Sequence, residues 1–555
     1  MSQPSASRSA PFWSALCGAG LVLGMLFVVA SLTPSLVPRS PLLQGVLSGL
    51  CFSAGYGCGV LLRHFWRILG WPELQGTARP RILGALLALC LLAMAAALWW
   101  EVGWQNRLRA LMQMPPNDGA SPWQMAITAV LVFALVLLLA RVLKTLKDRL
   151  ARRLARRIPA PTAAVLAVCV TVLFVWMLGN GVLVRAALSA LDRSYSELDA
   201  RLEEDLPRPV DALKSGGPGS LLDWSYLGRQ GRRMVANGPD RAQIEALTGR
   251  AAQEPLRVYV GLGAAPDPQQ RAKLALAELQ RIGAFARANL VIATPTGTGW
   301  IDSNGQQALE YVMQGDVATV AVQYSYFASG IALLTDPDYG VETARAVFST
   351  IYGHWRSLPQ TQRPRLYLQG LSLGALNSDL SHDLLQVISD PYNGALWVGA
   401  PFLAPTWRNL TAARNADSPA WLPRVGDGSV VRFTAQRNHL NEGHAPWGKH
   451  RVVFLQYASD AITFFDPQAL WRRPDWMQAP LGPDVSPDMR WIPVVSFLQL
   501  AFDLVFSDSP LVGYGHVYAF DHYADAWVSL AEPSDWDAER LALLKKRVAQ
   551  VGAKD

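Results

Sequence analysis

The chain has 555 residues, 51% of them hydrophobic, and a mean hydropathy of +0.15. This length allows two or more domains, and the mean hydropathy is high for a protein that is soluble along its whole length. The net charge of +7 does not favour nucleic-acid binding, because residues 1–189 hold 17 Lys and Arg against 4 Asp and Glu, whereas residues 190–555 hold 33 against 39.

Long apolar runs concentrate before residue 190. Each is about the length that a helix needs to cross roughly 30 Å of hydrocarbon. The runs cover residues 12–31, 42–62, 82–100, 126–143 and 163–183. They predict a transmembrane domain of about five helices over residues 1–189. We interpret the first run as a retained span, since no small-residue cleavage site of a signal peptide follows it.

The distribution of positive charge predicts the orientation of these spans. Residues 141–157 carry eight Lys and Arg and residues 63–81 carry four, whereas the connection after the first run carries only Arg39. Because the two basic segments flank alternate spans, both are expected in the cytoplasm together with the N-terminus. The C-terminal domain is then extracytoplasmic. All five cysteines lie in the predicted spans, so that domain has no disulfide and no thiolate nucleophile.

The remaining chain predicts a stalk and an α/β domain. Residues 190–220 predict a stalk helix followed by a Gly/Pro-rich flexible joint near 215–220. The catalytic domain is expected over residues 221–555. Near-continuous apolar strands alternate with amphipathic helices, which indicates a mostly parallel sheet with helices on both faces. Strands are expected at 256–262, 289–295, 317–327, 363–370, 394–401 and 451–460. Residues 402–449, rich in Trp and Pro, are expected as a lid-like insertion.

One five-residue motif indicates a catalytic serine. Gly370-Leu371-Ser372-Leu373-Gly374 fits G-x-S-x-G between a predicted strand and a predicted helix, the setting of a nucleophile elbow. The glycines remove side chains that would collide in the sharp turn, and Ser372 is left exposed at its tip. Without its flanking strand and helix, so short a pattern would be weak evidence.

A catalytic serine needs a base and an orienting acid, in the chain order Ser, Asp or Glu, His. His516 lies in a Gly-rich turn after the last sheet segment and fits the base better than His522 does. Asp460, at the carboxyl end of the last clear strand, is the predicted acid. It can alternatively serve only as a helix cap. Asp466, six residues later, competes for this role, and Asp503 and Asp508 are further candidates in less ordered contexts.

The developing oxyanion needs backbone donors. Leu373, directly after the nucleophile, is expected to supply one N–H. The stretch "PTGTGW" is expected to supply the other from Thr296 or Gly297, with the hydroxyl of Thr298 as a further contributor. The glycine patterns of phosphate loops are absent. The C-terminal domain shows no dense cluster of metal-ligating residues, so we expect no cofactor and no metal.

Several longer stretches together resemble a bacterial family of membrane-anchored α/β-hydrolases with a multispan N-terminal domain. They include "SLTPSLVPR", "PTGTGW", "GLSLGA", "ALWVGAPF", "YASDAITFF", "RWIPVVSFLQLAFDL" and "GYGHVY". The resemblance implies an α/β-hydrolase fold and ester hydrolysis, with Ser372, Asp460 and His516 in the triad positions. Two residues depart from the expected pattern: Ala461 stands where Pro is expected, and Tyr514 where His is expected.

These observations predict a serine esterase or lipase of the bacterial inner membrane. Tryptophans in the insertion (Trp407, Trp421 and Trp447) and the membrane tether favour a lipidic acyl ester as substrate, with membrane lipids as further partners. The same tryptophans can instead be packing residues. Two other interpretations are a membrane module whose outer domain binds a ligand without turnover, and a structural protein with an inactive hydrolase fold. The intact order of Ser, Asp and His argues against the last.

Overall fold

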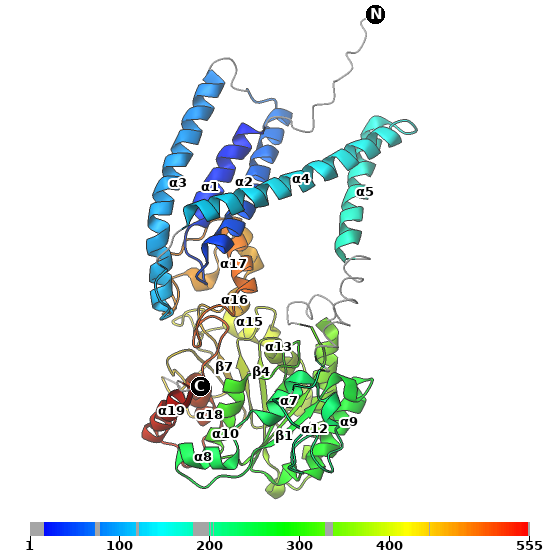
Figure 1. The fold of residues 1–555 in the computed structure, drawn as a ribbon, viewed down its shortest axis with the longest axis vertical. Helices are drawn as coiled ribbons and strands as arrows, with labels where there is room; N and C mark the ends of the chain where they lie inside the picture. The colour runs from blue at the N-terminus through cyan, green and yellow to red at the C-terminus, as the bar shows by residue number, and fades with distance from the viewer. Residues whose placement is uncertain are drawn as a thin grey trace, which may run out of the picture. The chain divides into compact units, whose positions relative to one another are not determined.

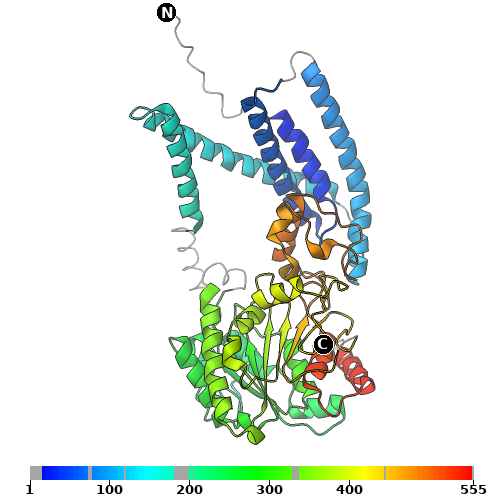
Figure 2. The same cartoon turned by 180° about the vertical axis from the view of Figure 1, so that it is seen from behind.

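The structure is a computed structural model that describes residues 16–72, 78–117, 121–180, 199, 201–203, 205–327, 337–442 and 445–552. The chain forms two compact units, drawn in Figures 1 and 2. The helical unit contains Met1–Ala186, Asp466–Met477 and Val485–Phe506. The sheet unit contains Ala187–Phe465, Gln478–Asp484 and Ser507–Asp555. The sequence prediction placed all of 221–555 in the C-terminal domain, so two segments of that stretch belong elsewhere.

Four helices in the described part of the helical unit are long and apolar enough to cross a membrane. They are α2 (Pro41–Ile68), α3 (Ala78–Leu111), α4 (Pro122–Leu154) and α5 (Ala160–Asn180). The first predicted span is different, because α1 (Gly18–Ser31) has only 14 residues. At 1.5 Å per residue it is about 21 Å long, shorter than the hydrocarbon core. Residues 12–15 of that prediction lie outside the described residues.

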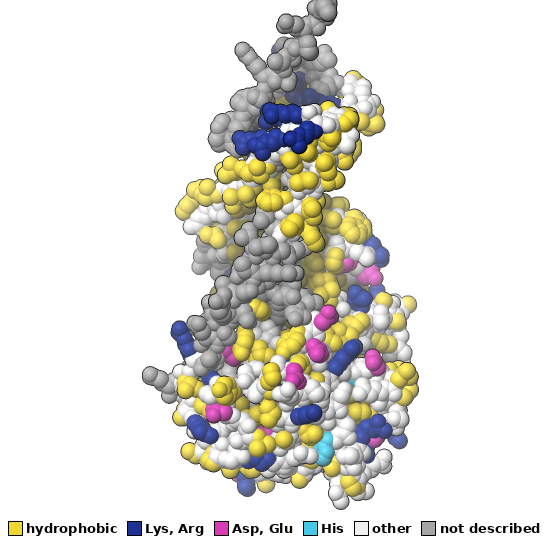
Figure 3. Space-filling model, turned by 90° about the vertical axis from the view of Figure 1, so that its right-hand side faces the viewer, with side chains coloured by type: hydrophobic (Ala, Val, Ile, Leu, Met, Phe, Trp, Pro, Cys, Tyr) yellow, Lys and Arg dark blue, Asp and Glu magenta, His cyan; other side chains and the backbone are white. Residues whose placement is uncertain are grey.

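All glycines in the second apolar run except Gly57 lie at helix contacts. A Cβ added to Gly45 would lie 2.8 Å from the carbonyl oxygen of Met125 on α4. On another face of α2, a Cβ on Gly59 would lie 2.6 Å from the carbonyl oxygen of Ala19 on α1. Small residues therefore let α2 approach both neighbours closely, as in other membrane helix pairs. In Figure 3, hydrophobic side chains cover much of the helical unit's visible face, and Lys and Arg gather at one end.

A helix from the C-terminal part of the chain completes the helical unit. This apolar helix, α17 (Val495–Val505), packs against α1 and α2. Nε2 of Gln499 donates to the carbonyl oxygen of Thr33 at 2.9 Å, and the backbone N–H of Leu36 donates to Oδ2 of Asp503 at 2.8 Å. Asp503, one of the competing triad acids, is thus engaged inside the helical unit.

The sheet unit is built on seven parallel strands in the order β1-β3-β2-β4-β5-β7-β6. The strands are β1 (Leu256–Val260), β2 (Asn289–Thr294), β3 (Val317–Val322), β4 (Arg365–Leu371), β5 (Gly394–Val398), β6 (Val431–Thr434) and β7 (Arg451–Leu455). Every residue of β1, β3 and β5 is buried, as expected for strands covered on both sides. The predicted α/β sheet is confirmed.

Helices cover both faces of this sheet. One hydrophobic core joins alternate strand residues such as Val291 and Tyr367 to α10 (Ser303–Val312), α18 (Phe520–Ala531) and α19 (Ala538–Gly552). The intervening residues Ile292 and Leu368 face α12 (Pro337–Ser357), which packs beside α9 (Pro268–Arg281). The remaining helices are short: α7 (Gly228–Ala236), α8 (Arg241–Thr248), α13 (Leu373–Asp379), α14 (Leu384–Val387), α15 (Pro405–Ala412) and α16 (Ala461–Phe464).

Three expectations differ from the structure. The insertion at 402–449 is not wholly outside the sheet, because β6 lies within it and pairs with β7 at the edge. The helix predicted directly after the Ser372 motif is divided into α13 and α14. The joint at 215–220 is anchored, since the hydroxyl of Ser220 and the N–H of Leu221 donate to the buried carboxylate of Glu278 at 2.7 and 3.0 Å. Residues 190–198 of the predicted stalk lie outside the described residues.

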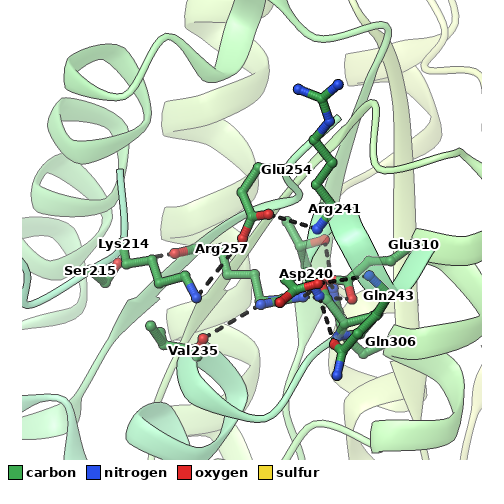
Figure 4. A network of polar contacts seen from close by, with 12 residues as sticks. Lys214, Ser215, Val235, Asp240, Arg241, Gln243, Glu254, Arg257, Gln306 and Glu310 are labelled. Atoms are coloured by element: carbon green, nitrogen blue, oxygen red, sulfur yellow. Dashed lines mark hydrogen bonds and ion pairs between the residues drawn. The ribbon is translucent and has the colours of Figure 1, made fainter. Parts of the chain in front are cut away.

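A buried ion pair joins β1 to α10 (Figure 4). Nε and Nη2 of Arg257 donate to the two carboxylate oxygens of Glu310 at 2.6 and 2.8 Å, and both side chains are almost fully buried. Nε2 of Gln306 adds a hydrogen bond of 2.7 Å to the same carboxylate. This bidentate geometry compensates for removing the two charges from water.

Candidate active site

The turn between β4 and α13 has the geometry of a nucleophile elbow. Ser372 lies between the two elements with φ 56° and ψ −125°, a left-handed conformation that side chains rarely adopt. A Cβ on Gly370 would lie 2.4 Å from the carbonyl carbon of Gly374, and one on Gly374 would lie 2.2 Å from the carbonyl oxygen of Thr294. Both motif glycines are therefore required by close backbone contacts.

His516 and Asp460 form a buried pair. Nδ1 of His516 lies 2.8 Å from Oδ2 of Asp460, in a loop that precedes α18. The same carboxylate oxygen accepts a hydrogen bond from the hydroxyl of Tyr518 at 2.7 Å. Oδ1 accepts the backbone N–H of Ile462 at 2.9 Å, so Asp460 also caps α16. The capping role and the contact with histidine coexist, because each uses a different oxygen.

The same short backbone segment lies against both the serine and the histidine. The backbone N–H of Ser372 donates to the carbonyl oxygen of Val398 at 3.0 Å. The next residue is Gly399, and a Cβ there would lie 2.7 Å from Cε1 and 3.0 Å from Nδ1 of His516. Nε2 of His516 is buried and has no hydrogen-bond partner among the described residues. That nitrogen is the one that a serine hydroxyl needs as its proton acceptor.

Family models match most of the chain. Residues 256–544 match a model described as "Alpha/beta-hydrolase family", and residues 32–239 match its N-terminal companion, "Alpha/beta-hydrolase family N-terminus". The chain belongs to this α/β-hydrolase family. No curated protein and no solved structure matches it. The family assignment and the parallel sheet together make the sheet unit an α/β-hydrolase domain.

The electrostatics of this hydrolase domain favour a charged imidazole. Burial alone lowers the pKa of His516, but the charge of Asp460 and its hydrogen bond outweigh that effect and raise the pKa above its usual value. Two further carboxylates act in the same direction, first Asp508 and then Asp302. Burial raises the pKa of Asp302 to about 6, against the lowering effect of the Tyr523 hydroxyl, which donates to it at 2.8 Å.

A second hydrogen-bond network fixes the histidine loop of the hydrolase domain. The hydroxyl of Ser459 accepts the backbone N–H of Gly515 at 2.9 Å and donates to Oδ2 of Asp484 at 2.5 Å. Gln436 donates to the same oxygen at 2.6 Å. Ser459 and Gly515 immediately precede Asp460 and His516, so this network ties the acid loop to the base loop.

The oxyanion residues are only partly arranged as expected. Leu373 is the first residue of α13, where a backbone N–H has no carbonyl within its own helix. The backbone N–H of Thr296 instead donates to the carbonyl oxygen of Trp300 at 3.0 Å, inside its own turn. Thr296 would have to break that bond to act as a donor. The hydroxyl of Tyr259 holds the same turn by donating to the carbonyl oxygen of Gly299 at 2.7 Å.

The rival candidates have other contacts. Nδ1 of His522 lies 2.6 Å from the hydroxyl of Tyr457, and Asp466 caps a short helix of the helical unit. The three tryptophans of the insertion also have structural roles. Trp407 donates to Gln456, Trp421 to the carbonyl of Pro480, and Trp447 lies 3.7 Å from the guanidinium of Arg432. These contacts fit the packing alternative, so the three tryptophans give little support to an apolar substrate.

Three residues of the site escaped the sequence analysis: Tyr518, Asp484 and Asp302. Tyr518 lies two residues after His516, within "GYGHVY", so its position was a usable signal. Asp302 follows "PTGTGW" by two residues. Nothing near Asp484 in the sequence indicates its role, because its contacts lie 25 or more residues away. The described residues include no group of three or more His, Cys, Asp or Glu that could hold a metal ion.

Proposed function

We propose that the protein is a membrane-anchored serine hydrolase that cleaves carboxylic esters through an acyl-enzyme. Ser372 is the nucleophile, His516 the general base and Asp460 the residue that orients the imidazole. One observation supports the proposal most strongly: Ser372 and His516 both contact the Val398–Gly399 segment. Ser372 has a strained backbone, and Nε2 of His516 has no partner among the described residues while Nδ1 contacts Asp460.

The chemistry follows from these positions. Nε2 of His516 removes the hydroxyl proton of Ser372 as the oxygen attacks the ester carbonyl, and the Asp460 carboxylate stabilises the imidazolium that forms. The N–H of Leu373 and the loop containing Gly297 stabilise the oxyanion. The imidazolium then gives its proton to the leaving alcohol. A water molecule, deprotonated by the same imidazole, hydrolyses the acyl-serine and restores the enzyme.

The substrate class is part of the proposal. A hydrolase tethered by span-length helices operates beside lipid, which supports a lipidic ester. The basic segments at 63–81 and 141–157 support a cytoplasmic position for the ends of the spans that they flank. Because α5 crosses the membrane once after the second basic segment, the hydrolase domain lies on the extracytoplasmic side of a bacterial inner membrane.

Covalent labelling tests the proposal. The full chain in detergent is treated with a fluorophosphonate probe, and wild type is compared with Ser372→Ala. We expect labelling of wild type and none of the variant, and Ser378→Ala, on the same helix, serves as the matched control. If folded wild type stays unlabelled across detergents and pH values, the hydrolase proposal fails and a ligand-binding domain without turnover becomes the better interpretation.

A further inference from the structure

A cavity of about 410 Å³ opens between α1, α2 and α3 of the helical unit. These helices run side by side in both ribbon views (Figures 1 and 2), and α1 contacts each of the other two. The volume lies within the range of roughly 300–1,000 Å³ that is common for small-molecule sites. Most of the lining is apolar and comes from all three helices: Val22, Leu23, Leu62, Ile82, Leu83 and Leu86.

Cationic side chains line the same cavity. Arg63 comes from the last turns of α2 and Arg79 from the first turn of α3. Nη1 of Arg63 lies 3.9 Å from Sγ of Cys17, and neither guanidinium pairs with a carboxylate within the described ranges. The lining also includes Gly18, the first residue of α1. The N-terminal ends of α1 and α3 therefore both adjoin the cavity, and their dipoles add to its positive potential.

The cavity lies at one end of two span-length helices. Trp66, one turn after Arg63, also lines it, and its indole N–H donates to the carbonyl oxygen of Pro72 at 3.2 Å. The Trp66 ring lies edge-on to that of Trp71, with centroids 4.7 Å apart. Tryptophan at a span end is typical of the boundary between hydrocarbon and headgroups. The arginines are thus at the depth of lipid phosphates, and the apolar lining is at the depth of acyl chains.

We infer that this cavity binds an anionic phospholipid. The phosphate lies between Arg63 and Arg79, and one acyl chain runs along the apolar walls of α1 and α3. Guanidinium groups bind phosphate oxygens with paired, charge-assisted hydrogen bonds, and basic pockets between membrane helices are typical sites for anionic headgroups. The site is independent of the proposed hydrolytic activity, since all of its residues belong to the helical unit.

Lipid titration followed by native mass spectrometry tests the inference. The full chain carrying Ser372→Ala, which prevents hydrolysis of the lipid, is titrated with phosphatidylglycerol and with phosphatidylcholine of identical acyl chains. We expect phosphatidylglycerol to bind more tightly. The pair Arg63→Gln and Arg79→Gln should weaken phosphatidylglycerol binding about thirtyfold, the effect of losing two cations next to an anionic headgroup. Phosphatidylcholine binding should change little.

Two matched variants separate this site from general surface charge. The pair Arg152→Gln and Arg153→Gln removes the same charge from the basic end of α4 and should leave the affinity near that of wild type. The pair Arg63→Lys and Arg79→Lys keeps the charge and should retain most of the binding, which also covers the case in which the Gln variant misfolds. Equal affinity for both lipids, or equal loss in the two Gln pairs, would overturn the inference.

Discussion

The helical unit and the sheet unit keep their apolar side chains in opposite places. Every residue of β3 is buried, whereas none of the most apolar eighteen-residue window of α4 is buried inside the protein. A strand that hides its apolar residues is adapted to water, while a helix that exposes them is stable only in hydrocarbon. One chain therefore contains two units whose exposed surfaces suit different solvents.

Both units bury charged side chains, and each contains some that are incompletely paired: in the sheet unit, Nε and Nη1 of the buried Arg232 have no partner among the described residues. In the sheet unit, Arg257 is paired with Glu310 and His516 with Asp460, each at hydrogen-bond distance. In the helical unit, Arg39 is buried and donates to the hydroxyl of Ser35 at 2.9 Å, but its Nε and Nη1 have no partner among the described residues. The sheet unit therefore contains one ion pair in its proposed active site and one in its core, and removing one partner from either pair should be destabilising or inactivating.

The largest expected effect comes from breaking the pair in the active site. Asp460→Asn removes the carboxylate that holds His516 in the correct tautomer, and we expect kcat/KM for an ester substrate to fall about 10⁴-fold. The exposed Asp417→Asn is the matched control and should retain wild-type activity, since its side chain lies on the surface. An Asp460→Asn enzyme within tenfold of wild type would refute the assigned acid.

The next largest effect is expected from breaking the buried ion pair between Arg257 and Glu310. Arg257→Met leaves the Glu310 carboxylate buried without its cation, and we expect the free energy of unfolding of the sheet unit to fall by about 3–5 kcal/mol. Denaturant titration of the detergent-solubilised chain measures this. Arg241→Met, which breaks an exposed pair with Glu245, should change the free energy of unfolding far less, because water screens the interaction of the two charges. Adding Glu310→Leu to Arg257→Met should recover part of the stability, and no recovery would contradict the ion-pair explanation.

Placing a charge on an exposed apolar surface of each unit tests whether the two units face different solvents. Leu135 on α4 and Leu385 on α14 are both exposed, at 57% and 85%. Leu135→Arg should cost about 2.5–3.5 kcal/mol of membrane insertion, because a guanidinium at the centre of a span is unfavourable. Leu385→Arg should change nothing measurable. The inserted fraction after alkaline extraction of membranes is the readout, and equal behaviour of the two variants would refute the two-solvent interpretation.

The smallest predicted effect concerns pH. His516 must be neutral to accept the serine proton, and its pKa is raised, so the rate falls as the pH drops through that raised value. Asp302→Asn removes a negative charge that stabilises the imidazolium. The acid limb of the kcat/KM profile should therefore move to lower pH.

Asp508 provides the control for the pH experiment. It also raises the pKa of His516, but it is exposed, so Asp508→Asn should shift the limb at low salt and much less at high salt. The buried Asp302 should act at both salt concentrations. The same profile for wild type and Asp302→Asn would show that this carboxylate does not influence the base.

Many features of this protein follow from short stretches of its sequence. Three features are local signals, because each depends on residues next to one another in the chain: the long apolar runs, the continuously apolar strands and the motif around Ser372. They predicted the two units, the sheet and the position of the elbow. Chain order and a glycine-rich turn selected His516 from eight histidines as the predicted base, and the structure places its Nδ1 beside Asp460.

Other features depend on contacts between residues that are distant in the sequence and meet only in the folded chain. Val495–Val505 looks like an ordinary core helix, and only packing against α1 and α2 assigns it to the helical unit. The segments that join the helical unit lie between Asp460 and His516 in the chain. In the folded sheet unit, Nδ1 of His516 nevertheless lies 2.8 Å from Oδ2 of Asp460. Asp484 has no local signal at all. Such roles arise only when buried polar groups must find partners across the fold, because leaving them unpaired is unfavourable.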